Sequence, residues 1–271
     1  MHRGRLKLHF QTASIIGRIH FMKEVHFIAQ GKGGVGKSFI ASLIAQYFHE
    51  RVGEELHCYD TDPVNPTFSR YRQLQPKTVN ILTENNHIDT RRFDGLMEEL
   101  IEGEGIAVVD NGAATFVPLM SYLADNQVPE LLRDAGVRMV VHVPLNGGQA
   151  LDDCMGGLLQ SLNSIKAEFV VWLNDFKGKV EQDGRQFYDY KVYKTHKDAI
   201  LGIVRLENRN PDTFGTDIAQ MTERNLTFAE AAAHPDFKVM ARSRLHRVKQ
   251  DVWRQLDGLP LLSQEDAVHA G

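Results

Sequence analysis

A glycine-rich segment at residues 31–38 constrains the fold of this chain more than any other feature. It reads GKGGVGKS, follows the short apolar run 25–30, and precedes a stretch whose apolar residues recur at helical spacing. A strand, a glycine loop and a helix in this order let backbone N–H groups converge on an anion at the helix N-terminus. The segment also matches the phosphate-loop pattern in full. It therefore predicts a nucleoside triphosphate site.

The rest of the chain alternates strand-like runs with helical stretches, which is typical of βαβ units and a parallel sheet. We therefore expect an α/β fold, a doubly wound, mostly parallel sheet flanked by helices. The expected strands are residues 25–30, 56–59, 79–82, 106–109, 137–143, 169–173 and 200–204. Expected helices follow the glycine loop, cover residues 93–101 and 151–162, and close the chain.

The 271 residues suit one large domain or at most two small ones, and no stretch reads as a linker or an internal repeat. We expect a single P-loop domain over residues 22–262 and a tail at 263–271. Residues 1–21 carry four basic side chains and no acid. They are either a targeting peptide or an N-terminal extension that is disordered or wrongly assigned. The second interpretation is preferred, because the strand that begins near Met22 needs nothing upstream.

Charge and cysteine content exclude several classes of protein. The formal net charge of −4 argues against a surface built wholly for nucleic acid. Cys58 and Cys154 lie far apart and share no metal-ligand spacing, so we expect both to be packing residues in a cytoplasmic protein. No apolar run approaches the roughly 18–20 residues that a membrane span needs, so we expect no membrane partner.

Each part of the glycine loop has an expected task. The Lys37 ammonium would neutralise the β- and γ-phosphates, and the Ser38 hydroxyl would bind Mg²⁺. Lys32 is not required by the general pattern, and taken alone it is equally well a solvated surface lysine. The expected nucleotide-binding residues of this segment are Gly31, Lys32, Gly33, Gly34, Val35, Gly36, Lys37, Ser38 and Phe39.

A lysine after the first glycine, as in GKGGVGKS, resembles the deviant Walker A family, which includes the MinD and ParA ATPases. The resemblance implies a P-loop ATPase with ATP and Mg²⁺ as ligands, and a homodimer formed across the bound nucleotide. In such a dimer Lys32 would reach the partner's nucleotide and stabilise charge on the transferring phosphoryl group. The implied activity is slow, Mg²⁺-dependent ATP hydrolysis, with Lys32, Lys37 and Asp62 as catalytic residues.

The resemblance assigns four further positions. Asp62 in DTDP resembles the family's first switch aspartate, whose carboxylate orients the attacking water. The alternative is that Asp62 is a turn aspartate. Neighbouring Asp60 would serve structure or the outer shell of Mg²⁺. Asp110 ends an apolar run, as does the Walker B carboxylate that holds Mg²⁺ through water. The N–H of Gly112 would sense the γ-phosphate. Asn174 resembles the base-contacting asparagine or is a turn residue. The expected Mg²⁺ residues are Ser38, Asp62 and Asp110.

The segments QGKGGVGKS, DTDPVNPTF, DNGAATFVPL, NQVP and VVWLN together resemble the TraL-type ATPases of plasmid conjugal transfer regions, from about Met22 to the last helix. Partition ATPases more often read DLDPQGN at the first switch. The motifs therefore favour a dimerising switch ATPase of plasmid conjugal transfer, with a conjugation-machinery protein as partner. The alternative is a ParA-like partition or positioning ATPase that binds DNA non-specifically in its ATP state.

Two segments are candidate partner surfaces. Residues 176–198 mix basic and aromatic side chains, which suits single-stranded nucleic acid; packing of the aromatics against the sheet is the preferred alternative. The last helix carries an apolar stripe made of Leu245, Val248, Val252, Leu256 and Leu259. Away from this stripe lie Arg244, Arg247 and Arg254, which would contact DNA phosphates or are simply solvated.

Overall fold

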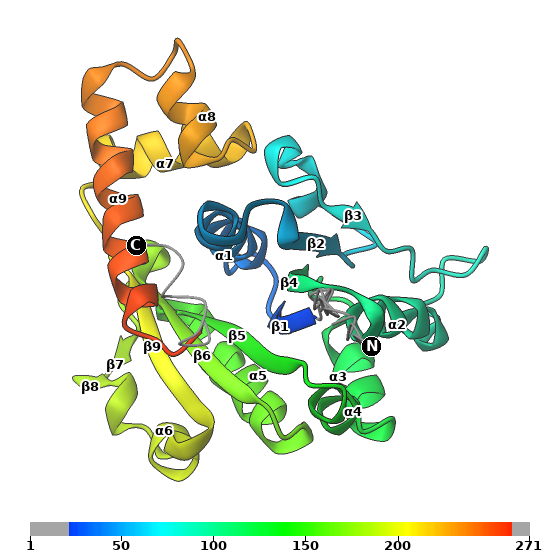
Figure 1. Ribbon diagram of the computed structural model, residues 1–271. Helices are drawn as coiled ribbons and strands as arrows, with labels where there is room; N and C mark the ends of the chain where they lie inside the picture. The colour runs from blue at the N-terminus through cyan, green and yellow to red at the C-terminus, as the bar shows by residue number, and fades with distance from the viewer. Residues whose placement is uncertain (1–21, 262–271) are drawn as a thin grey trace, which may run out of the picture.

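The computed structural model of the chain describes residues 22–261, so the predicted extension 1–21 and tail 263–271 lie outside the described residues. A seven-stranded sheet, parallel at every pairing, runs through it in the order β3-β2-β4-β1-β5-β6-β9 (Figure 1). Its strands are β1 Met22–Ile28, β2 Leu56–Asp60, β3 Lys77–Thr78, β4 Gly105–Asp110, β5 Arg138–Asn146, β6 Glu168–Asn174 and β9 Ile200–Leu206. The predicted doubly wound, parallel α/β fold is confirmed.

Helices cover both faces of this sheet. One buried cluster joins the sheet to α1 Lys37–Val52, α7 Thr216–Glu223, α8 Phe228–Ala233 and α9 Val239–Asp257. The other joins it to α2 Phe93–Glu102, α3 Phe116–Asp125, α4 Val128–Asp134, α5 Leu151–Ser164 and α6 Lys191–His196. A short hairpin, β7 Glu181–Gln182 and β8 Arg185–Gln186, lies between β6 and α6 (Figure 1). Strands buried on both faces explain the continuous apolar runs in the sequence.

The position of β1 places the glycine loop. β1 pairs with β4 on one side and with β5 on the other. The chain therefore winds toward β2 and β3 on one side of β1, and toward β6 and β9 on the other side. In open parallel sheets, ligands bind outside the carboxyl ends of the strands at such a reversal. The loop 29–36 leaves β1 at this edge.

Three predicted strands differ clearly from the structure. The first of them, β1, spans Met22–Ile28 rather than 25–30. The strand expected at 79–82 is wrong: the sheet takes only Lys77–Thr78, and Leu82 instead pairs with Ile88 in an isolated bridge. The Asn80 side chain accepts a hydrogen bond from the Leu82 N–H, which turns the chain away from the sheet edge. β5 is longer than predicted and continues through Pro144.

The proline is tolerated inside β5 because β1 has already turned into the glycine loop. The last pairing of β1 with β5 joins Ile28 to His142. Beyond it the Gln30 side chain takes over, because its amide donates to the Pro144 carbonyl at 3.1 Å. The Gln30 side chain thus donates the hydrogen bond that a neighbouring strand would otherwise have to give to the Pro144 carbonyl.

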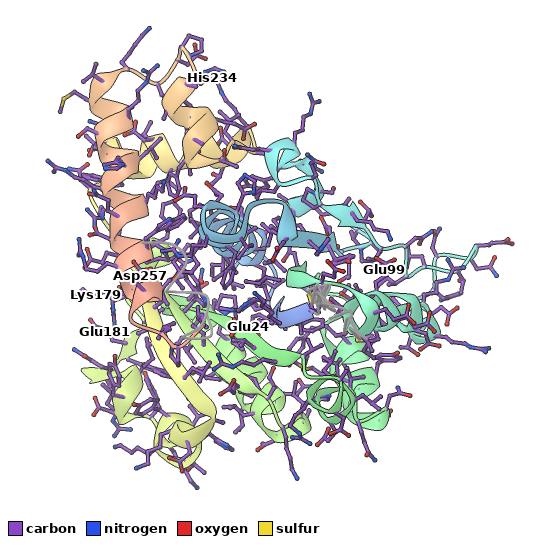
Figure 2. All side chains as sticks on the ribbon, viewed as in Figure 1. Glu24, Glu99, Lys179, Glu181, His234 and Asp257 are labelled. Carbon is purple, nitrogen blue, oxygen red and sulfur yellow. The ribbon has the colours of Figure 1, made fainter. Side chains whose placement is uncertain are left out.

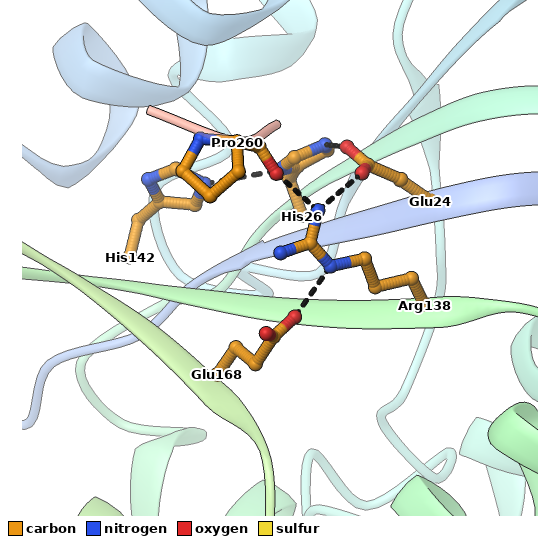
Figure 3. A network of polar contacts seen from close by, with 6 residues as sticks. All are labelled: Glu24, His26, Arg138, His142, Glu168 and Pro260. Atoms are coloured by element: carbon orange, nitrogen blue, oxygen red, sulfur yellow. Dashed lines mark hydrogen bonds and ion pairs between the residues drawn. The ribbon is translucent and has the colours of Figure 1, made fainter. Parts of the chain in front are cut away.

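A line of buried polar side chains crosses β6, β5 and β1. Figure 3 draws its members on β5 and β1, which are His142, His26 and Glu24. The Trp172 indole donates to His142 Nδ1 at 3.0 Å, so in neutral His142 the proton lies on Nε2. His142 Nε2 lies 3.0 Å from His26 Nδ1 and therefore donates to it. The proton of His26 is then on Nε2, which lies 3.2 Å from Glu24 Oε2. Burial, and then the neighbouring His26, hold the pKa of His142 well below its usual range.

Arg138 closes this line at the amino ends of the strands (Figure 3). Its guanidinium donates to Glu24 at 2.8 Å and to Glu168. It also donates to the Pro260 carbonyl, which lies just after α9. A second tie of α9 to the body is Asp257 (Figure 2), which accepts from Tyr47 Oη at 3.0 Å. The last helix is therefore fixed to the core by polar contacts as well as by its apolar stripe.

Candidate functional site

The glycine loop joins β1 to α1 in the conformation that an anion cradle requires. Gly34 and Gly36 have positive φ angles of 70° and 93°, and Gly36 is the N-cap of α1. A side chain at position 36 would also approach the Asn174 amide nitrogen to 3.0 Å. Successive backbone N–H groups and the N-terminus of a long helix therefore face the same small volume, which is suited to phosphate.

Lys37 and Asp110 meet below this loop. Lys37 is the first residue of α1 and is mostly buried, and its ammonium donates to the Lys32 carbonyl at 3.2 Å. Burial lowers the pKa of Lys37, while the charges of Asp110 and Asp62 oppose that shift. Asp110 ends β4 and is buried, and burial raises its pKa to about 7 against a hydrogen bond from Ser38. The predicted Ser38, Lys37 and Asp110 are therefore brought together.

The donor set at this point fits Mg²⁺. Asp110 Oδ1 is buried and has no hydrogen-bond partner among residues 22–261. The Ser38 hydroxyl bonds to the same carboxyl group, so both oxygens lie at the entrance to α1. Hydroxyl, carboxylate and phosphate oxygens are the ligands that Mg²⁺ prefers. A cation here would satisfy the unpartnered oxygen and offset the cost of burying a carboxylate.

Asp62 lies against the second switch segment. A Cβ added to Gly112 would fall 2.6 Å from Asp62 Cγ, so only glycine leaves room for this carboxyl group. Asp62 Oδ1 accepts from the N–H groups of Val64 and Asn65, at 2.9 and 3.0 Å. Asp62 is therefore the turn aspartate of the alternative interpretation, and it also stands beside Gly112 near the loop. Its catalytic role stays a prediction.

Asp60 braces the same segment. It is fully buried, and its two oxygens accept from the N–H groups of Asp62 at 3.0 Å and Ser69 at 2.8 Å. Burial raises its pKa, and these two backbone hydrogen bonds oppose the shift. Asp60 holds the first switch in place, as the structural interpretation of this residue predicted.

The Lys32 side chain contacts α5. Its ammonium lies 2.6 Å from Asp153 Oδ2 in the first turn of α5, and both side chains are largely exposed. The hydrogen bond to Asp153 is the main cause of the raised pKa of Lys32. The Lys32 ammonium is therefore partly exposed at the edge of the loop, and its contact with a partner's nucleotide stays a prediction.

A cavity of about 600 Å³ adjoins the loop, between β5, β6 and β9 on one side and α7 and α9 on the other. Gly34, Gly36 and Phe39 line it on the loop side. Asn174 also lines it, but its amide already donates to the Val35 carbonyl at 3.1 Å, and its Oδ1 accepts from Phe176 N at 3.3 Å. Asn174 therefore holds the loop in place, and its contact with a base stays a prediction.

Several residues of the site were not predicted from the sequence. Gln30 donates to Pro144 and to the Cys154 carbonyl, and its Oε1 accepts from the Lys32 N–H at 3.4 Å, so it ties the loop to α5. Asn111 accepts from the Thr61 and Thr115 hydroxyls and thereby joins the two switch segments. The only sequence signal was a polar residue at the end of an apolar run for Gln30, and the position directly after Asp110 for Asn111.

Asn146 was also missed. It pairs in register with Asn174, lines the cavity, and has a buried Oδ1 with no donor in the part of the chain that the structure describes. The predicted packing role of both cysteines is confirmed: Cys58 in β2 and Cys154 in α5 are buried free thiols.

The two candidate partner surfaces are less open than the sequence suggested. In residues 176–198 the preferred alternative holds for three aromatic side chains, because Phe187 is fully buried and Tyr190 and Tyr193 pack on the core. Phe176 and Tyr188 are exposed. On α9 the three arginines do not form one free basic face. Arg244 is half-buried and donates to Asp217, and Arg254 lies 3.2 Å from Asp251. Arg247 is exposed.

Comparison with known proteins identifies the family. Two curated proteins, each named Protein TraL and each from Escherichia coli, are 43% and 41% identical to this chain over 243 residues. Each match covers 89% of the chain and all of the relative. The chain belongs to the TraL family. This confirms the resemblance to TraL-type proteins that the loop and switch motifs carried.

Among solved structures, this TraL family member is similar to the MinD cell division protein of Aquifex aeolicus, with a TM-score of 0.48 and 16% identity over 87% of this chain and 97% of MinD. It is also similar to a Cyanothece McdA variant in complex with ATP, with a TM-score of 0.40 and 11% identity over 90% of this chain and all of McdA. No protein-family model matches the chain. Within residues 22–261, no helix combines the length and apolar character needed to cross a membrane.

Proposed function

We propose that this TraL family member is a cytoplasmic switch ATPase of plasmid conjugal transfer. It binds ATP with Mg²⁺ at the loop between β1 and α1, dimerises across the nucleotide, and hydrolyses ATP slowly. A protein of the conjugation machinery would be its partner. The observation that carries the proposal is a buried oxygen of Asp110 that has no hydrogen-bond partner within residues 22–261. It lies beside Ser38, below a cradle of backbone N–H groups.

The residues of the site divide the chemistry among them. The loop amides and Lys37 would bind the phosphate chain, and Asn174 holds the loop through Val35. Ser38 and Asp110 would hold Mg²⁺, which would neutralise charge on the β- and γ-phosphates when bound. Asp62, packed against Gly112, would accept a hydrogen bond from the attacking water.

The dimer is proposed from Lys32. Its ammonium forms an ion pair with Asp153 at the edge of the loop. Because this ion pair is exposed, little free energy is needed to break it. A γ-phosphate in a second molecule offers this lysine a more highly charged partner than one carboxylate does. Exchange of Asp153 for that phosphate would couple ATP binding to dimer formation and bring a second positive charge to the phosphoryl group.

Three measurements test the function. A fluorescent ATP analogue should bind to the purified chain with Mg²⁺, and Lys37→Ala should abolish binding. Light scattering after size exclusion should detect a dimer with ATP and a monomer with ADP. Steady-state hydrolysis should be slow in the wild type and lost in Lys32→Ala, which should still bind the nucleotide. A monomer that binds ATP and hydrolyses it without Lys32 would refute the switch.

The DNA-binding alternative has less support from the surface of α9. Asp217 pairs with Arg244, and Asp251 is shared between Arg254 and Arg209. A phosphate-binding face needs several free cations, because each contact contributes separately. DNA binding therefore stays a prediction, and a gel shift with ATP at two salt concentrations would test it.

A further inference from the structure

A third lysine approaches the phosphate loop from outside the motif. Lys177 is the last residue of the 3₁₀ turn η6, Asp175–Lys177, which follows β6. Its ammonium donates to the Gly34 carbonyl at 3.1 Å, across 143 positions of sequence. We propose that Lys177 is a nucleotide-binding residue, which contacts the phosphate nearest the ribose. This inference rests on the proposed ATP site.

The backbone that carries Lys177 is held in place at several points. The Asn174 side chain caps η6 by accepting from Phe176 N. Asp175 is buried, and its carboxylate accepts from the Val180 N–H at 2.9 Å and from Arg205 at 2.6 Å. A long, flexible side chain therefore starts from a rigid base, which reduces the entropy lost when its ammonium binds a ligand.

In the free protein, the Lys177 ammonium makes one hydrogen bond to a residue that the structure describes, although it has three donors. Its one hydrogen bond to a residue that the structure describes goes to a neutral carbonyl, and no carboxylate in residues 22–261 pairs with it. An ammonium has three donors, and a hydrogen bond to an anion is stronger than one to a carbonyl. A phosphate oxygen within reach would therefore compete successfully with Gly34 for Lys177.

The position of η6 shows which part of the nucleotide Lys177 would meet. Phe176 and Lys177 both line the 600 Å³ cavity, which also reaches Gly34, Gly36 and Phe39 of the loop region. Phe176 is 53% exposed, which suits a side chain that a base would cover. With the base in the cavity and the terminal phosphates on the loop, Lys177 stands where the two meet.

The contact would also link the nucleotide to the segment between β6 and β9. That segment contains η6, the β7–β8 hairpin and α6, and is the longest connection between neighbouring strands on this side of the sheet. A ligand bridged by Lys177 would pin the start of the segment to the loop. Hydrogen exchange of residues 175–182 should therefore slow when nucleotide binds.

The test compares Lys177→Met and Lys177→Arg with Lys179→Met, an exposed lysine two positions away. For wild type and each variant, the Kd of ADP and of a non-hydrolysable ATP analogue is measured by titration calorimetry at low and high salt. Lys177→Met should weaken both nucleotides by the same factor, about 5- to 10-fold at low salt for an exposed charged contact, and less at high salt. Arginine should restore most of the affinity, and Lys179→Met should match the wild type.

Two readouts separate positioning from folding. The nucleotide-dependent protection of residues 175–182 should be lost in Lys177→Met, and the Tm of this variant without nucleotide should equal that of the wild type. Wild-type affinity and protection in Lys177→Met would overturn the inference while leaving the ATP site intact. A wild-type chain that binds neither nucleotide would overturn the proposed function, and the inference with it.

Discussion

The histidine line gives this protein a predicted loss of stability in mild acid. His142 is fully buried and neutral, and its Nδ1 accepts a hydrogen bond that protonation would destroy. Its pKa is far below the usual value in the folded chain but ordinary in the unfolded chain. The unfolded state therefore binds a proton at His142 that the folded state does not bind. As a result, the free energy of unfolding falls as the pH drops below about 6.5, the pKa of a histidine in the unfolded chain.

The size of the stability loss follows from the one proton that the unfolded chain binds and the folded chain does not. Each pH unit below the unfolded pKa costs about 1.4 kcal/mol for one excluded proton. Between pH 7 and pH 5 the loss is about 2 kcal/mol, since the first half-unit lies above the unfolded pKa. In a chain of this length that loss lowers the Tm by about 4–8 °C.

A substitution isolates this term from the other titrating groups. Glutamine at position 142 offers one acceptor to Trp172 and one donor to His26, but it takes up no proton in this range. Urea unfolding of wild type and His142→Gln at pH 7 and pH 5 should show the acid loss reduced by about 2 kcal/mol in the variant. His246→Gln, at an exposed histidine of α9, should leave the acid loss unchanged.

His142→Leu provides the complementary measurement. It leaves the Trp172 N–H and His26 Nδ1 buried without partners, at about 1–3 kcal/mol each, and should destabilise the protein at both pH values. The reasoning is refuted if His142→Gln and wild type lose equal stability on acidification, since His142 would then not exclude a proton.

Three further predictions concern single contacts. Gly112→Ala should displace the Asp62 carboxyl and reduce ATP hydrolysis at least tenfold with little change in nucleotide affinity; retained kcat would count against a role for Asp62. Asp153→Ala should lower the ATP concentration needed for dimer formation, seen by sedimentation, because it frees the lysine at the rim of the loop; a higher requirement would contradict this. Arg244→Ala should lower the Tm and Arg247→Ala should not, because of these two arginines only Arg244 has an ion pair within residues 22–261; equal melting curves would show that the pair contributes nothing.

Local patterns predicted the fold because they follow the physics of a two-sided parallel sheet. The run ending at Asp110 is buried at all six positions of β4, as a central strand should be. The expected strand at 79–82 failed at the sheet edge, where β3 pairs only with β2 among the strands that the structure describes and the Asn80 side chain ends the pairing. Edge strands have less burial to specify them, so sequence pattern is weakest there.

The site was predictable where its residues are neighbours in sequence, and only in part where they are not. The loop, Asp62 and Asp110 lie at or just after strand ends, so their convergence at one edge could be predicted. The contacts of Gln30 with Cys154 and of Lys177 with Gly34 join segments more than a hundred positions apart. The pairing of Arg244 with Asp217 likewise depends on how α7 meets α9. Such contacts depend on tertiary packing, which no local periodicity encodes.

Among residues 22–261, buried polar side-chain atoms without a hydrogen bond have different surroundings at the two edges of the sheet. At the amino edge, Glu24 Oε2 and His26 Nε2 face each other at 3.2 Å. At the carboxyl edge, Asp110 Oδ1 lies beside the loop with no partner among residues 22–261. An unsatisfied buried acceptor costs stability unless a ligand supplies its partner, so this oxygen should weaken the free protein and serve the bound one.

Asp110→Asn tests directly whether this oxygen lowers the stability of the free protein and contributes to ligand binding. Because burial raises the pKa of Asp110 to about 7, the charged form is disfavoured in the free chain, and the neutral amide should raise the Tm without nucleotide. The same change removes the carboxylate proposed for Mg²⁺, so ATP with Mg²⁺ should no longer increase the Tm. Asp60→Asn is the matched control, since both Asp60 oxygens accept backbone N–H groups and an amide must lose one of these bonds and destabilise the chain. A free Asp110→Asn protein that melts below the wild type would show that the Asp110 carboxylate supports the fold rather than a ligand.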